Sequence, residues 1–252
     1  MFKKLSISKG FKALGFSLAI AFSLPLNAGM LGFWSDNGWT TIDEEDGFKS
    51  GGYVGPGWGG QTFDAEYLFA KQEGSILSIG LQTGFDLADG SQFYRKKQYF
   101  AGDLALAFNG GNFDYAIDFG LVTKDIQGDN VGLGSGNQDA TGLYADVQWN
   151  NDISFGQSAP FGMDEGSFLA SVTGTSGSET LADGKSYFRT VSFDLEDLGF
   201  KVSDFKAHWT MSCGNDVVEG SARVPEPSPL WLMIGGLLAL VGSLKFKGGF
   251  NA

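Results

Sequence analysis

The sequence is poor in the residues that most often cross-link a fold or catalyse a reaction. Its 252 residues include one cysteine, Cys213, and one histidine, His208. A single cysteine excludes an intrachain disulfide, and a single histidine excludes a metal site built from several histidines. No Gly-x-Ser-x-Gly segment occurs, so the nucleophile turn of the α/β-hydrolases is absent. A Ser-His-Asp triad would have to use His208.

Basic residues are scarce as well, with 17 Lys and Arg against 29 Asp and Glu, a formal net charge of −12. Six of the basic residues flank two terminal apolar segments, so the chain between those segments carries 11 basic and 29 acidic residues, a net charge of about −18. Such an acidic chain repels phosphate backbones, and nucleic acid is not an expected partner. The charge favours solubility and weak binding of divalent cations.

Neither of the two terminal apolar segments reaches the roughly 20 residues that a membrane-spanning helix needs. The first covers 14 residues, 13–26, after Lys3, Lys4, Lys9 and Lys12, and it ends at Asn27-Ala28. Basic residues, an apolar run and a small residue in this order are typical of a secretory signal peptide. We expect signal peptidase to cut after Ala28; an uncleaved anchor helix is the alternative.

The second apolar segment covers 16 residues, 229–244, and Lys245 and Lys247 follow it. Basic residues thus flank both segments on their outer sides. The positive-inside rule keeps both lysine groups in the cytoplasm and places the chain between them across the membrane. We therefore expect an exported body with a membrane-inserted precursor, divided into residues 1–28, 29–222 and 223–252. An ordinary C-terminal anchor is the alternative.

The last 29 residues also carry a motif, which is Val224, Pro225, Glu226, Pro227 and Ser228 ahead of the apolar run and the basic tail. This order resembles the PEP-CTERM sorting signal of exosortase substrates. The resemblance implies cleavage near Pro225-Glu226-Pro227 by a membrane-embedded exosortase. It also implies transfer of the body to the cell surface or to an extracellular polysaccharide matrix. The segment HWTMSCGND, residues 208–216, is similar to segments of other exosortase-dependent surface proteins.

The body has the pattern of an all-β domain. Its 39 glycines have no three-residue period, which indicates many turns rather than collagen. Aromatic and β-branched residues alternate with polar ones in stretches that predict strands. These stretches are residues 63–69, 76–85, 99–108, 113–122, 143–149, 168–173, 186–195 and 205–213. Asn109 to Asn112 predicts a hairpin turn, and only residues 194–198 indicate a helical turn. We expect an antiparallel two-sheet sandwich, jelly-roll-like, with a barrel as the alternative.

Two glycine-rich stretches, residues 51–60 and 128–136, predict long mobile loops. The first carries Tyr53 and Trp58, which together with Trp34 and Trp39 are candidates for stacking on sugar rings. Packing of the same rings into a core is the alternative.

Calcium is the one cofactor that the sequence suggests. Asp125, Asp129 and Asn130 offer oxygen ligands in a glycine-rich turn, and Asp139 follows. The EF-hand pattern is incomplete because its final glutamate is missing. No other cofactor is expected.

The acidic clusters at residues 43–46, 164–165 and 196–197 could supply the carboxylate pair of a glycosidase, or they are solvated loops. Cys213 is either a reactive thiol or a small buried residue on the last strand. The sequence favours a structural or adhesive surface protein without catalysis, with exosortase, signal peptidase and extracellular polysaccharide as partners. A secreted carbohydrate-binding module or a carboxylate-based glycan-active enzyme is the alternative.

Overall fold

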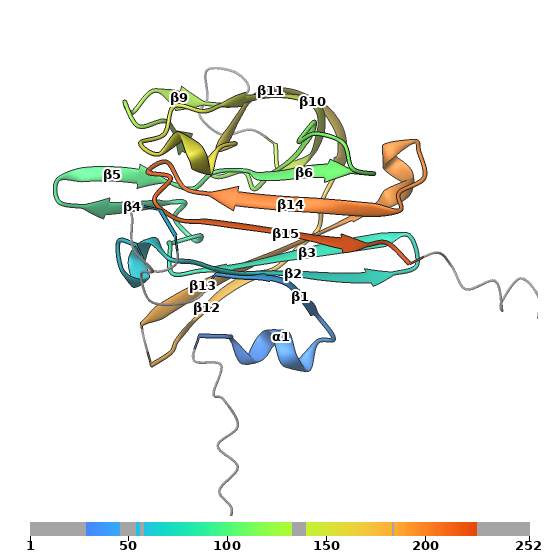
Figure 1. The fold of residues 1–252 in the computed structure, drawn as a ribbon, viewed down its shortest axis with the longest axis horizontal. Helices are drawn as coiled ribbons and strands as arrows, with labels where there is room; N and C mark the ends of the chain where they lie inside the picture. Colours follow the sequence, from blue (N-terminus) through green and yellow to red (C-terminus); the bar gives the residue numbers. More distant parts are fainter. Residues whose placement is uncertain (1–28, 46–53, 56–57, 133–139, 183, 226–252) are drawn as a thin grey trace, which may run out of the picture.

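The computed structural model describes residues 29–45, 54–55, 58–132, 140–182 and 184–225. The predicted signal peptide with its cut at Ala28, Tyr53, Asp139 and the sorting segment from Glu226 through Lys245 and Lys247 lie outside these residues. The described chain is mostly β, and its two main antiparallel sheets stack in a way consistent with a sandwich (Figure 1). No helix within the described ranges has the length and apolar character needed to cross a membrane.

The first sheet has five strands in the order β1-β2-β3-β13-β12. Their bounds are β1 Thr40–Glu44, β2 Ala65–Glu73, β3 Ile76–Thr83, β13 Lys185–Asp194 and β12 Ser176–Thr180. The second sheet has six strands in the order β11-β10-β7-β6-β14-β15. Their bounds are β11 Gly162–Ser171, β10 Gly142–Asn150, β7 Tyr115–Asp118, β6 Leu104–Phe108, β14 Asp204–Thr210 and β15 Val217–Arg223.

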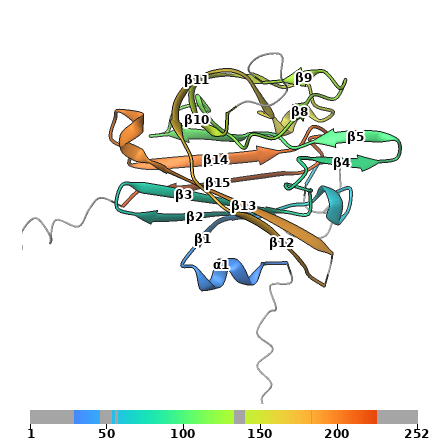
Figure 2. The same ribbon diagram turned by 180° about the vertical axis from the view of Figure 1, so that it is seen from behind.

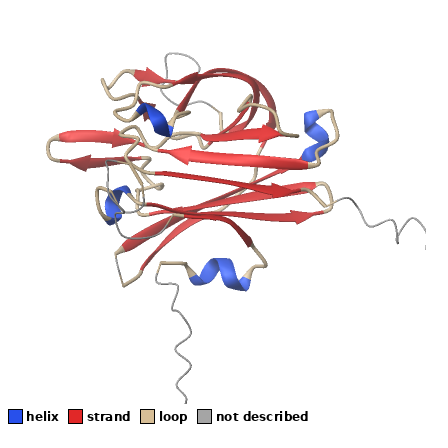
Figure 3. Cartoon of the chain, in the orientation of Figure 1, coloured by secondary structure: helices blue, strands red, loops and turns tan. Residues whose placement is uncertain are grey.

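Two hairpins stand outside the main sheets, β4 Ser91–Tyr94 with β5 Lys97–Phe100 and β8 Thr123–Lys124 with β9 Asn130–Val131. Helical structure in the described chain is limited to α1 Gly32–Asp36 and the 3-10 turns η1 Gln61–Phe63, η2 Gly156–Ser158 and η3 Leu195–Leu198 (Figure 3).

The main core lies between the two sheets. On β3, alternate residues Leu77, Ile79 and Leu81 are buried and belong to one apolar cluster with Leu106 of β6 and Trp209 of β14. This period of two is the one expected when one face of a strand packs on a second layer. At one edge of the sandwich, β1 lies beside β15, so the two sheets are also joined laterally.

A second apolar cluster covers the outer face of the five-stranded sheet, where α1 lies (Figure 2). The Trp34 ring stacks on Phe69 with ring centroids 4.2 Å apart. Gly80 of β3 makes room for it, because a Cβ at that position would lie 2.5 Å from a Trp34 ring atom. The indole nitrogen of Trp34 donates a hydrogen bond of 2.6 Å to the Gln82 amide oxygen. Trp34 is therefore buried packing and not a sugar-stacking surface; Trp39 packs on the same cluster.

The prediction of an all-β chain with antiparallel sheets is confirmed, and so are the hairpin between β6 and β7 and the helical turn at η3. The predicted strand 99–108 is wrong, because the chain leaves the β4–β5 hairpin at Phe100 and enters the main sheet at Leu104. Gly102 marks that crossing, where a Cβ would lie 2.6 Å from the Thr210 carbonyl oxygen. The predicted strand 205–213 ends at Thr210, and a further strand, β15, follows it.

The strand predicted at 168–173 begins earlier, at Gly162, and the one predicted at 113–122 is reduced to β7. Part of the second glycine-rich stretch is not a loop, because β9 pairs with β8 there. The folded part also extends past the predicted boundary at residue 222, since Val224 is buried and its N–H donates to the Ser203 carbonyl over 2.9 Å.

Candidate functional site

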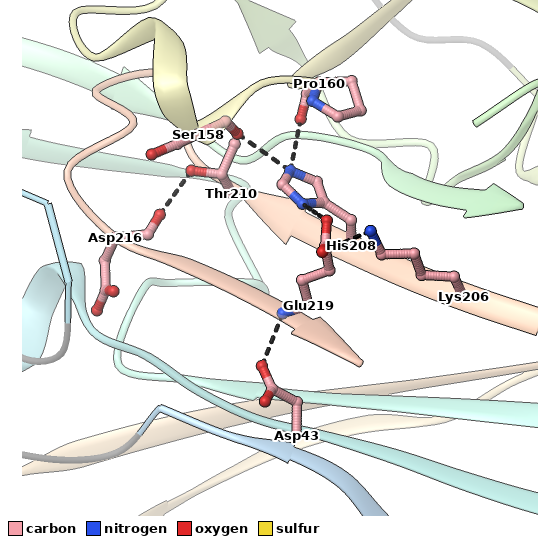
Figure 4. Close-up of polar contacts among 8 residues, drawn as sticks. All are labelled: Asp43, Ser158, Pro160, Lys206, His208, Thr210, Asp216 and Glu219. Atoms are coloured by element: carbon pink, nitrogen blue, oxygen red, sulfur yellow. Dashed lines mark hydrogen bonds and ion pairs between the residues drawn. The ribbon is translucent and has the colours of Figure 1, made fainter. Parts of the chain in front are cut away.

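The segment 208–216 connects β14 to β15 and joins several distant parts of the chain. His208, only 2% exposed, starts it. Its Nε2 lies 3.0 Å from the carbonyl oxygens of both Ser158 and Pro160, so this nitrogen must carry a hydrogen (Figure 4). Its Nδ1 lies 3.2 Å from the Glu219 carboxylate. Burial lowers the pKa of His208, and the neighbouring Glu219 opposes that effect.

This arrangement does not form a catalytic triad. Ser158 meets His208 through its carbonyl oxygen, while its hydroxyl donates to the Gly214 carbonyl over 2.6 Å. A serine nucleophile needs its hydroxyl on the histidine base. Ser158 is also fully buried. The hydrogen bond between Ser158 and His208 fixes the η2 turn against β14, and we assign Ser158 no nucleophilic role.

Glu219 extends the same network to the other sheet. Its carboxylate pairs with Lys206 Nζ at 2.6 Å, and its N–H donates to the Asp43 carboxylate over 2.7 Å (Figure 4). Asp43 lies on β1, so this bond fastens the edge of the five-stranded sheet to β15.

At the other end of the segment, Asp216 forms a buried carboxyl pair with Asp64. Asp216 is inaccessible to solvent and Asp64 is 4% exposed. The Asp216 carboxylate accepts hydrogen bonds from the N–H groups of Ala65 at 3.0 Å and Val217 at 2.9 Å. Burial raises the pKa of Asp216 to about 9, and the hydrogen bond with Asp64 acts in the same direction. Two buried carboxyls sharing a proton hold the sheets together but offer a substrate no access.

A pocket of about 240 Å³ lies at the same end of the sandwich, beside Cys213 and Asn215. Aromatic rings form most of its wall, and its lining is Trp58, Gly59, Phe63, Tyr94, Tyr99, Ser154, Phe155, Cys213 and Asn215. The structure thus places the predicted stacking residue Trp58 in a pocket.

Asn215 positions the Trp58 segment, because its amide donates a hydrogen bond to the Trp58 carbonyl oxygen. Gly59 has φ +99°, and a Cβ there would lie 2.6 Å from the Asn215 amide nitrogen. Only glycine fits such a left-handed, close approach without strain. The close approach of Asn215 therefore explains why a glycine stands at position 59.

The opposite wall of the pocket comes from the β4–β5 hairpin, which sequence reasoning missed. The Phe63 ring makes edge contacts with both hairpin tyrosines, with centroids 5.5 Å from Tyr94 and 5.1 Å from Tyr99. The local signal was present: the sequence SQFYRKKQYF has a pair of aromatic residues on each side of the basic run Arg95 to Lys97. It lacked a glycine or asparagine to mark the turn.

Cys213 lies in the turn between β14 and β15 and not on the last strand. Its side chain is buried, which is what one of the two interpretations predicted. Its thiol donates to the Asn215 side-chain oxygen. Burial raises the pKa of the thiol to about 12. Since the thiolate is the reactive form, the reactivity of this thiol is low in the folded chain.

We predict that a thiol reagent at pH 8 labels Cys213 at least roughly tenfold more slowly in the folded chain than in the denatured chain, because the folded thiol is buried and protonated. Labelling followed by absorbance and mass measures both rates. The denatured chain serves as the control for reagent quality. Immediate labelling of the folded chain would show that the thiol is open and ionised, against the structure.

The predicted calcium ligands belong to the β8–β9 hairpin. Asp125 uses one carboxylate oxygen to accept the N–H groups of Gln127 at 2.8 Å and Asp129 at 2.9 Å, which closes the turn. Asp129 and Asn130 are exposed. Among the residues that the structure describes, no group of three His, Cys, Asp or Glu side chains is arranged to hold a metal ion. Calcium binding stays a prediction.

The acidic clusters that suggested a glycosidase lie on separate elements, the first of them on and just after β1 with Asp46 outside the described residues. Asp164 and Glu165 lie on β11 beside an open polar hollow, and Glu196 and Asp197 lie in η3. The lining of the aromatic pocket contains no acidic side chain among the described residues. Comparison of the chain with known proteins adds nothing further: no family model, no curated protein and no solved structure matches it.

Proposed function

We propose that the chain is an exported protein of the cell surface or the extracellular matrix, structural or adhesive in role, and that an exosortase sorts and cleaves its C-terminal segment. The observation that carries this proposal is how the described body meets the sorting motif. Val224, the first residue of the sorting motif, is buried, whereas Pro225 is exposed. The packed part of the described chain therefore reaches the start of the proposed cleavage region, and cleavage there would keep Val224 and all of the strands in the mature chain.

The N-terminal side supports the same division. The backbone carbonyl of Gly29 accepts a hydrogen bond from Gln82, and Leu31 is buried against α1. The first residues that the structure describes, directly after Ala28, are thus already packed, and this is where signal peptidase is expected to cut. We also favour a jelly-roll-like class for the sandwich, since the neighbouring strands β3 and β13, and likewise β6 and β14, are far apart in sequence.

The shape of the domain suits a tethered protein. Strand β15 ends at the opposite end of the sandwich from the β4–β5 hairpin (Figures 1 and 2). Tyr94 and Tyr99 of this hairpin line the aromatic pocket. A body attached through the segment after β15 would present the pocket away from its attachment. This placement favours adhesion through the pocket, and it is also the observation that favours a carbohydrate-binding module as the second candidate function.

Export and sorting predict a mature chain that starts at Gly29 and ends near Pro225 or Glu226. Mass spectrometry of the two termini, in cells with and without the processing enzyme, measures this. We expect the trimmed chain outside the cell in the first case and a longer, membrane-associated chain in the second. The variant Pro225→Ala/Glu226→Ala/Pro227→Ala should retain the tail, and Ser221→Ala on exposed β15 is the matched control. Full-length chain in the cytosol of normal cells would refute the proposal.

A further inference from the structure

The turn of the β4–β5 hairpin consists of two basic residues whose backbone conformation is strained. Tyr94 pairs with Lys97, which leaves Arg95 and Lys96 as a two-residue turn. Both have positive φ, 46° and 70°. Such turns favour Asn-Gly because long side chains are disfavoured in this conformation. Residues kept in a disfavoured conformation at an exposed tip indicate a role other than stability. The hairpin projects beyond the neighbouring strands (Figures 1 and 2).

The hairpin register puts Lys97 on the same face as the two tyrosines that line the aromatic pocket. Tyr94 lies opposite Lys97 and Gln92 lies opposite Tyr99, and residues two apart on a strand share a face. Tyr94, Lys97 and Tyr99 therefore lie on the pocket side. The Arg95 guanidinium lies 5.2 Å from the centre of the Tyr94 ring, and Lys97 Nζ lies 5.5 Å from that of Tyr99. The pocket thus has aromatic walls and a cationic rim.

These cations stand out on so acidic a chain. Residues 91–100 contain three basic residues and no acidic one. Arg95, Lys96 and Lys97 are all exposed, and none of them forms an ion pair with a carboxylate among the described residues. Tyr94 is 43% exposed and Phe93 is 68% exposed. The tip therefore presents positive charge that no carboxylate of the described chain neutralises, beside open aromatic surface.

We propose that the aromatic pocket and the tip of the β4–β5 hairpin bind a carboxylate-bearing sugar unit of an acidic polysaccharide. The apolar face of the sugar ring would stack on Trp58 and Tyr94, while its carboxylate pairs with Arg95 and Lys97. A pocket of about 240 Å³ is smaller than drug-sized sites of roughly 300–1,000 Å³, which suits a single ring of a longer polymer.

A protein surface is a poorer fit than a sugar. A second copy of this acidic chain would satisfy the cations, but it would leave the ring-sized aromatic pocket unexplained. The proposal rests on the proposed function, because it names the ligand of the pocket that a tethered body would present. Binding by purified protein does not depend on export, so failure of one proposal is distinguishable from failure of the other.

The test measures binding of the purified full chain to polygalacturonate and to the same polymer with its carboxyl groups reduced. We expect binding to the first only, weakening as salt is added. Arg95→Gln/Lys97→Gln and Trp58→Ala should each weaken it by at least about tenfold. The matched controls are Lys201→Gln/Arg223→Gln, which removes two charges at the opposite end, and Phe168→Ala, which removes an exposed ring elsewhere. Both controls should bind normally.

A second variant separates loss of binding from loss of folding. Arg95→Asn/Lys96→Gly installs the favoured turn, so it should raise the melting temperature while it weakens binding to polygalacturonate. Equal binding to the reduced polymer, equal loss in the control variants, or normal binding by Arg95→Asn/Lys96→Gly would overturn the proposal. So would concentration-dependent self-association that needs Arg95 and Lys97 while polygalacturonate is not bound.

Discussion

Replacement of Trp34 by alanine is expected to lower the free energy of unfolding by about 3–5 kcal/mol, the range for a large aromatic residue removed from a packed site. Trp34 is 1% exposed and stacks on Phe69, and its indole N–H satisfies Gln82. Loss of the ring opens a cavity and leaves a buried amide oxygen with one donor fewer. Urea denaturation followed by circular dichroism measures the change. Trp58→Ala, which removes a partly buried tryptophan, is the control and should cost much less.

The contact between Trp34 and Gly80 allows a double-mutant test of the same packing. Gly80→Ala should destabilise the native chain, because the new Cβ would meet the Trp34 ring at 2.5 Å. In the Trp34→Ala background the same change should be neutral or stabilising, since the space is free and alanine is better than glycine within a strand. The two effects are thus expected to be strongly non-additive. Additive effects would show that Trp34 does not rest on β3 as the structure has it.

The interior strands could be predicted from the sequence, whereas of the edge strands of the two main sheets only part of β11 was predicted. β3 and β6 are rich in leucine, isoleucine and alanine because both of their neighbours and one full face are protein. The missed strands β1, β12 and β15 are all at sheet edges. Edge strands face water along one side and carry more polar residues, which hides their period of two. The sequence TTIDE of β1 illustrates this.

The candidate site was only partly predictable, because its parts are distant in the chain. The sequence marked Trp58 and the segment around Cys213, but nothing local joins them to Tyr94. Asp64 and Asp216 form their pair across 152 positions, a contact that the β14–β15 connection creates by returning beside β2. Helix α1 was missed for a different reason: its five residues are too short for a helical period to be recognised.

Between pH 7 and pH 9 the free energy of unfolding should fall as the pH rises, by up to about 1.4 kcal/mol per pH unit for one linked proton. The cause is Asp216, whose pKa burial and Asp64 raise from 3.8 to about 9. In this range the folded chain keeps the proton and the unfolded chain has lost it. The stabilisation is therefore complete below about pH 4 and is lost as the pH rises through 9.

The range above pH 7 isolates this pair from the other buried groups. Burial lowers the pKa of His208 below 6.5, so its contribution is lost only as the pH falls below that value. The Cys213 thiol adds a slope of the same sign towards pH 9.0, where half of the unfolded thiol is ionised, so the slope between pH 7 and 8 belongs mainly to the carboxyl pair. Asp216→Asn removes the ionising group and should flatten the slope between pH 7 and 9, whereas Asp129→Asn, in an exposed turn, should leave it unchanged. Urea midpoints across this range measure both slopes. An undiminished slope in Asp216→Asn would mean that the proton is held elsewhere, and the buried carboxyl pair would then not be what links the β14–β15 turn to the start of β2.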